Sequence, residues 1–243
     1  MKKHSFVEKV DTLFHNDIGK IYLSIRDEIF ANLYNSDFGE FGMSYNDLVA
    51  VVEGEGLPNS LLQFINQSTN NTSDLRCFVV DPIYNMEIYV IIGNDLSLSN
   101  RFDNKPDGLT FHYYEDVLNT PSDDQLEITT TRMIVDIIVV GMLSDGIKHR
   151  SDKKDRVHHV LKHEIVHCAL NYLEDMKDVC IDKLSEDEEE FLCDFIPFYG
   201  NRDVTVNEIN RSISAFMEKI DMFKPECRNK YKELITQLIN HYT

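Results

Sequence analysis

Residues 157–176 read VHHVLKHEIVHCALNYLEDM. Apolar side chains recur in this stretch at spacings of three and four residues, which is the period of one helix face. The pattern predicts one long helix that runs from about Ser151 to Met176. Its apolar stripe consists of Val157, Leu161, Ile165, Ala169, Leu173 and Met176.

The chain that follows this helix also shows helical patterns. Ser185 and Glu188 have the spacing of a capping box, so we predict a helix that begins at Ser185 and ends at Pro197. Two more helices are predicted at about 206–223 and 227–240. The C-terminal part is therefore expected to be a helical lobe.

The chain that precedes the long helix changes from helical to extended. Apolar spacing predicts a helix over residues 5–35 and two shorter ones at 46–53 and 60–67. From Leu75 onward, runs of β-branched and aromatic residues predict a small sheet. Its expected strands are Cys77–Val80, Ile88–Ile92, Leu109–Tyr114 and Ile128–Val140, the first two forming a hairpin and the second half of the last also compatible with a buried helix.

These segments together predict an α+β fold. It has a helical N-terminal part, a small twisted and mainly antiparallel sheet, the long helix, and the helical C-terminal lobe. We expect a helical region at residues 1–74 and a second domain at 75–243, or one continuous domain.

Charge and cysteine content limit the classes of function. The 243 residues include 24 Lys+Arg and 42 Asp+Glu, a formal net charge of −18. Such a surplus of acids repels phosphate and argues against nucleic acid and membrane partners. The 5 cysteines show no C-x-x-C spacing, and no apolar stretch resembles a signal peptide, so we expect a cytoplasmic protein with reduced thiols.

One motif within the long helix carries chemistry, His163-Glu164-Ile165-Val166-His167. Residues four apart share a helix face, so the imidazoles of His163 and His167 point to the same place. Imidazole nitrogens are preferred ligands of Zn²⁺. Glu164 lies beside the first histidine, where its carboxylate can take a proton from a water molecule on the metal.

The motif resembles that of the zincin superfamily of HExxH zinc metallopeptidases. The later stretch Glu190-Phe191-Leu192-Cys193-Asp194 is similar to the gluzincin branch, in which a second helix supplies a glutamate. The resemblance covers about residues 157–197. It implies that Glu190 is the third metal ligand and that Asp194 accepts a hydrogen bond from a ligand histidine. It also implies that an edge strand of the sheet binds an extended peptide.

The residues themselves leave the third ligand open. Residues 186–190 are all acidic, and acids at a helix N-terminus need no catalytic explanation. The helical wheel puts Glu188 nearer the buried face than Glu190. Glu188 and Glu189 therefore remain alternatives to Glu190.

The expected function is zinc-dependent hydrolysis of peptide bonds in a protein or peptide substrate, as an endopeptidase, with Glu164 as the general base. The alternative is a regulatory or protein-binding module of zincin-like fold in which catalysis is weak or lost. Tyr172 and Tyr199 are candidates for the group that stabilises the transition state.

Overall fold

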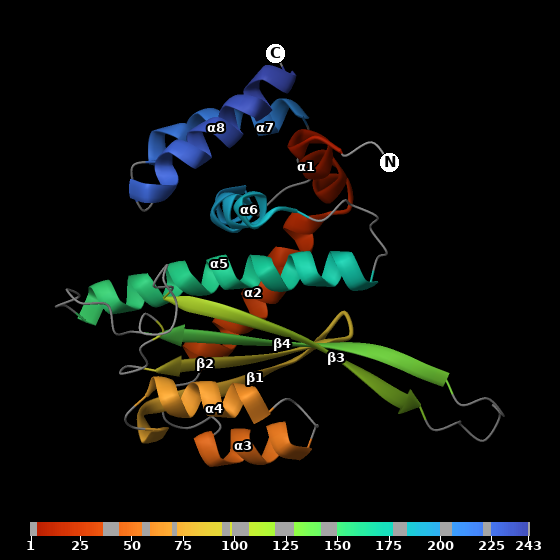
Figure 1. Cartoon of the computed structure of the whole chain (residues 1–243), viewed down its shortest axis with the longest axis vertical. Coiled ribbons are helices and arrows are strands. Elements are labelled where there is room, and N and C mark those ends of the chain that lie inside the picture. Colours follow the sequence, from red (N-terminus) through yellow and green to blue (C-terminus); the bar gives the residue numbers. More distant parts are fainter. Residues whose placement is uncertain are drawn as a thin grey trace. The chain divides into compact units, whose positions relative to one another are not determined.

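A computed structural model of the chain confirms the α+β fold (Figure 1). Its described part has eight α-helices and one sheet of four strands. The structure describes residues 4–35, 44–54, 59–69, 72–93, 98, 107–119, 129–141, 150–176, 184–199, 206–220 and 225–242.

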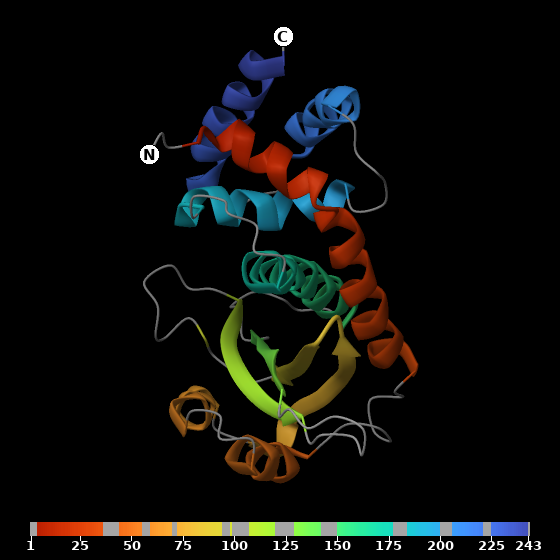
Figure 2. The same cartoon turned by 90° about the vertical axis from the view of Figure 1, so that its right-hand side faces the viewer.

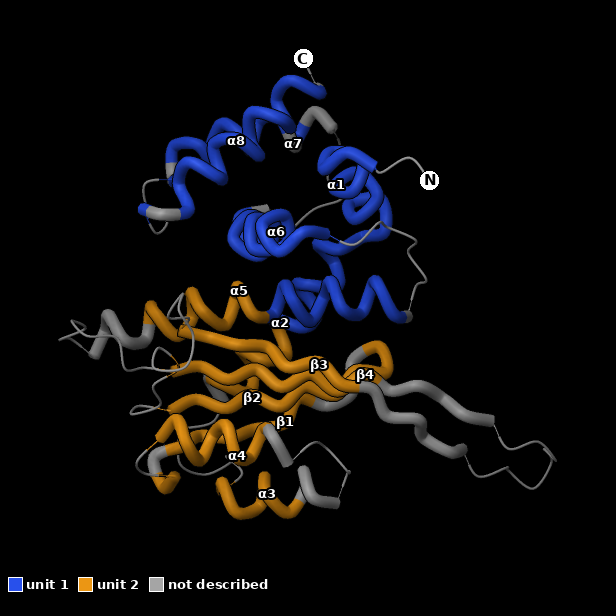
Figure 3. Tube along the Cα trace, viewed as in Figure 1, with its two compact units in different colours: residues 1–26, 165–243 blue, residues 27–164 orange. Residues whose placement is uncertain are grey.

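Contacts divide the chain into two compact units (Figure 3). Unit 1 comprises residues 1–26 and 165–243, and unit 2 comprises residues 27–164. The unit boundaries fall within two helices, α2 (Ile18–Asn35) and α5 (Arg150–Met176). Contacts alone do not define domains, so the domains expected at 1–74 and 75–243 stay a prediction.

Unit 2 contains the sheet. Its strands are β1 (Leu75–Ile83), β2 (Met86–Gly93), β3 (Gly108–Asn119) and β4 (Thr129–Gly141), in the order β1-β2-β4-β3. β1 pairs with β2 and β3 with β4 in antiparallel fashion, whereas β2 and β4 are parallel. Two of the three pairings are thus antiparallel, and β3 is an edge strand of this sheet.

The hairpin of β1 and β2 forms with a tighter turn than the sequence suggests. Ile83 pairs with Met86, and both loop residues between them, Tyr84 and Asn85, have positive φ. This is the type I′ geometry that matches the twist of two-residue hairpins. β4 is a strand over its whole described length, so the alternative of a buried helix in its second half is wrong.

The two faces of the sheet pack against different helices (Figure 2). Odd-numbered residues such as Val135, Ile137 and Val139 pack with α3 (Tyr45–Gly54) and α4 (Asn59–Ser68). The opposite face lies against α5, because Thr110 and Gly108 approach the α5 residue Glu164. Alternation along the strands therefore assigns even-numbered residues of β3 and β4 to the α5 side.

Unit 1 is helical. It contains α1 (Phe6–His15), the start of α2, the second half of α5, α6 (Glu186–Tyr199), α7 (Val206–Lys219) and α8 (Pro225–Tyr242). Within unit 1, α6 lies between the second half of α5 and the α7–α8 pair (Figures 1 and 2). Its Phe191 is fully buried and contacts the rings of Phe6, Phe195 and Phe216, so aromatic packing fixes the rotation of α6.

The helix expected over residues 5–35 is interrupted. α1 ends at His15, and Asp17 adopts a φ of 63° before α2 begins. Aspartate tolerates this left-handed conformation better than most residues. Among the described residues, no helix has the length and apolarity that a membrane span requires.

Candidate metal site

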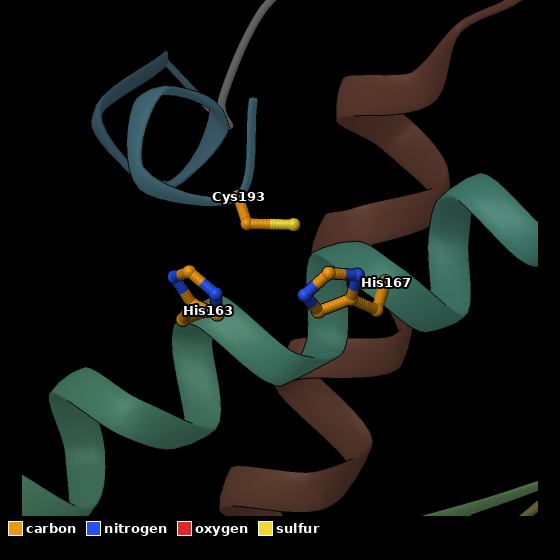
Figure 4. A group of neighbouring side chains, drawn as sticks. All are labelled: His163, His167 and Cys193. Atoms are coloured by element: carbon orange, nitrogen blue, oxygen red, sulfur yellow. The ribbon is translucent and has the colours of Figure 1, made fainter. Parts of the chain in front are cut away.

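Helix α5 brings together the two histidines and the glutamate of the HEIVH motif. His163 and His167 lie one turn apart on the same face (Figure 4). Glu164 lies on the adjacent face and is only 5% exposed. The unit boundary follows Glu164, but the helix continues without a break to Met176, so helical geometry alone sets the spacing of the two imidazoles.

The start of α6 is fixed by the predicted capping box. The backbone N–H of Ser185 donates to Glu188 Oε2 at 2.9 Å, and the backbone N–H of Glu188 donates to Ser185 Oγ at 3.3 Å. Lys9 Nζ of α1 donates to the same Glu188 Oε2 at 2.8 Å, and both side chains are largely buried. Glu188 therefore helps to anchor the helix that carries Glu189 and Glu190, the other two candidates for the third ligand.

His167 lies between these two glutamates within unit 1. Its Nδ1 is 2.7 Å from Glu189 Oε1, and its Nε2 is 3.7 Å from Glu190 Oε1. A carboxylate that accepts from Nδ1–H leaves the Nε2 lone pair available to a metal. Two ligands of a tetrahedral zinc ion are themselves about 3.3 Å apart, given bonds of about 2 Å. The Glu190 carboxylate is thus near the separation from Nε2 that a shared ion would need.

Cys193 adds a sulfur to the two imidazoles. Its side chain is 0% exposed and points toward the space between His163 and His167 (Figure 4). Ligand atoms of these three residues all lie within 4.8 Å of one another, the one such group among the residues that the structure describes. Cys193 was not among the ligands predicted from the sequence, because the gluzincin pattern has a small residue at this position. The missed signal is that cysteine sulfur is itself a zinc ligand.

Comparison with family models, curated proteins and solved structures gave no match.

The chemistry of the donor atoms is therefore the basis for judging which metal ion fits the site. Two imidazoles, a carboxylate and a thiol are the side-chain groups that bind Zn²⁺ in proteins. The Glu189 carboxylate on the outer nitrogen of His167 is a usual support for a zinc-binding histidine. The residues present fit a zinc ion.

Within unit 2, residues of the sheet hold the side chain of Glu164. Thr110 Oγ1 of β3 donates to Glu164 Oε2 at 2.8 Å. Gly108 leaves room for the same carboxylate, since a Cβ at this position would lie 2.5 Å from Glu164 Oε1. The edge strand β3 therefore holds the general-base candidate in one place, and neither contact was visible in the local sequence pattern.

The remaining candidates have other surroundings. Asp194 Oδ2 accepts a hydrogen bond from Tyr231 Oη at 2.5 Å, and its expected contact with a ligand histidine stays a prediction. Burial, and next the nearby Asp194 carboxylate, raise the pKa of Tyr231 far above its ordinary value. Tyr172 is buried on α5, and the side chain of Tyr199 lies outside the described part of the chain.

Proposed function

We propose that this protein is a zinc-dependent hydrolase of peptide bonds. The observation that carries the proposal is the HEIVH helix with both imidazoles on one face and the Glu164 carboxylate bound to an edge strand. This arrangement combines two metal ligands, a positioned base and a place for an extended substrate.

His163, His167 and Glu190 would hold the zinc ion. The 3.7 Å separation of Glu190 Oε1 from His167 Nε2 supports Glu190 as the third ligand. A catalytic zinc site has three protein ligands and an open position, so Glu190 and the adjacent Cys193 cannot both bind in the active form. We assign Glu190, because its carboxylate lies near the separation from His167 Nε2 that two ligands of one ion need.

Glu164 would act as general base and then as general acid. A zinc ion in this site supplies Lewis acidity toward water and the substrate carbonyl. The Glu164 carboxylate takes one proton from the attacking water while the oxygen bonds to the carbonyl carbon and the carbonyl π electrons move to its oxygen. The carbon–nitrogen bond then breaks, and Glu164 returns the proton to the leaving amine.

Strand β3 offers a surface for an extended substrate. Gly141 N donates to Asp107 O at 2.8 Å, and Gly108 pairs with Val140 without a register shift. In antiparallel sheets such bonded pairs alternate with pairs whose backbone groups point away from the partner. The N–H and C=O groups of Gly108, Thr110 and His112 therefore face away from β4, where a peptide strand can pair with them.

The net charge of −18 favours basic peptides as substrates and disfavours nucleic acids and anionic membranes. None of Cys77, Cys168, Cys193 and Cys227 is in a disulfide. Reduced thiols are usual in a reducing compartment, and we propose the cytoplasm as the location.

The decisive test uses purified protein with measured metal content. Wild type should contain zinc, cleave some members of a basic peptide library, and lose this activity to a chelator. Glu164→Gln should retain zinc and lose at least about a thousandfold in rate, since it removes the base. Lys162→Gln, an exposed substitution two residues away on α5, is the matched control. Bound zinc without any cleavage would instead favour a regulatory module, and absence of bound zinc would contradict the metal site.

The third ligand has its own test in cobalt-substituted protein. With Glu190 as ligand, the spectrum lacks a sulfur-to-cobalt charge-transfer band, and Glu190→Gln weakens metal binding more than Cys193→Ser. A strong charge-transfer band that Cys193→Ser removes would assign Cys193 in place of Glu190.

A further inference from the structure

A buried carboxylate, that of Asp136, lies on β4, an inner strand of the sheet. Asp136 of β4 is 0% exposed, and all the remaining residues from Ile134 to Val140 are apolar. Burying a charged carboxylate among apolar side chains is costly unless it is paired and hydrogen-bonded. We therefore expect that the role of Asp136 is to bind a partner side chain and not to stabilise the apolar core.

That partner is His112 on the edge strand β3. The two residues are directly opposite in the register of β3 and β4, and His112 Nδ1 is 2.5 Å from Asp136 Oδ1. The His112 side chain is 21% exposed whereas that of Asp136 is inaccessible. A carboxylate on Nδ1 holds the ring in one orientation, and a ring that carries a proton on both nitrogens also has a donor at Nε2.

His112 lies on the same face of β3 as the residues that hold Glu164. Gly108, Thr110 and His112 alternate along this face, and Thr110 bonds directly to the Glu164 carboxylate. Two residues along a strand span about 7 Å. A peptide paired with β3 would thus pass both Glu164 and His112.

We propose that His112 is a second catalytic residue, whose Nε2–H donates to the substrate carbonyl oxygen as negative charge develops there, and that Asp136 is its positioning residue. This inference rests on the proposed peptide hydrolysis. It assigns the transition-state donor to the His112–Asp136 pair in place of Tyr172 or Tyr199. A single donor of this kind contributes about 10²–10³ in kcat.

The test compares variants on a peptide that the zinc-loaded wild type cleaves. His112→Gln should lower kcat by about 10²–10³ and change KM little, because the interaction forms only in the transition state. His112→Ala should regain part of its activity when imidazole is added, which a merely structural histidine would not allow. Asp136→Asn should lower kcat by about 10- to 100-fold. Tyr113→Phe, on the opposite face of the same strand, is the control.

Three further readouts separate catalysis from folding and from the metal. Zinc content of His112→Gln should equal that of wild type, and the variant should remain folded at the assay temperature, although the loss of the ring beside Asp136 lowers its melting temperature. A phosphinic peptide, a stable mimic of the tetrahedral state, should bind this variant more weakly by the same factor as kcat/KM falls. Full kcat in His112→Gln, or a loss that follows loss of zinc or of fold, would overturn the role of His112 and leave the hydrolase intact. A wild type that binds zinc but cleaves no peptide would overturn both proposals.

Discussion

Substitution of Gly108 by alanine is expected to displace the Glu164 carboxylate. The added Cβ would lie 2.5 Å from Glu164 Oε1 and 2.5 Å from Val160 Cγ1. Ordinary contact needs about 3.5 Å, so each group must move by about 1 Å. Such a movement stretches the 2.8 Å bond from Thr110 to Glu164 Oε2 beyond hydrogen-bonding distance.

The displacement has two expected effects, a lower free energy of unfolding and a lower rate of peptide cleavage. Overpacking costs about 1–3 kcal/mol, and loss of a hydrogen bond to a charged acceptor costs about 1.5–3 kcal/mol. Partial relaxation of the flexible carboxylate makes a total of about 2–4 kcal/mol the expected result. A misplacement of about 1 Å also lowers kcat/KM by roughly 100-fold, with zinc retained, because no proposed ligand moves.

Urea unfolding of zinc-free protein and peptide cleavage by zinc-loaded protein measure the two effects separately. In a Glu164→Ala background, Gly108→Ala should cost at least about 1 kcal/mol less, because only the contact with Val160 remains. An equal cost in both backgrounds, together with unchanged cleavage, would refute the idea that β3 positions Glu164.

Three other substitutions test the supports of the site. Lys9→Met leaves the Glu188 carboxylate without its buried cation and should lower the free energy of unfolding by about 3 kcal/mol, as measured in urea. A Lys9→Met/Glu188→Leu double variant should recover most of this loss, and no recovery would argue against a buried pair. Glu189→Ala should weaken zinc binding by about 10- to 100-fold in competition with a chelator, and unchanged affinity would mean that Glu189 does not support His167. The folded protein raises the pKa of Tyr231 above its ordinary value of 10.0, so the unfolded chain loses this proton first and stability falls as pH rises above that value. The loss approaches about 1.4 kcal/mol per pH unit, and Tyr231→Phe should show a shallower decline; identical slopes would contradict the assignment.

Patterns within a short segment predicted the helices and strands well. The period of apolar residues identified α5, and the Ser185–Glu188 spacing identified the start of α6. The break at Asp17 was missed, because the apolar stripe continues on both sides of one residue with positive φ. β4 was ambiguous for a related reason, since a strand that is buried on both faces has no alternation to read.

The site was predictable only where its residues are neighbours in sequence. His163, Glu164 and His167 lie within one helical turn, and helix geometry sets their directions. Thr110 lies 54 residues before Glu164, and His112 lies 24 residues before Asp136. These contacts depend on strand order and register, which no single segment of sequence contains.

The run of acids at the start of α6 shows why periodicity could not choose a ligand. Successive residues of a helix point about 100° apart, so three consecutive glutamates face three directions. Glu188 meets Lys9, which is 179 residues away in sequence, Glu189 meets Nδ1 of His167, and Glu190 lies near Nε2 of the same ring. The helical wheel placed Glu188 nearer the buried face than Glu190, which agrees with the pairing of Glu188 to a buried lysine. Burial, however, reports how far a side chain points inward and not which atom it meets. The third ligand therefore depends on the partner that the fold brings to each direction.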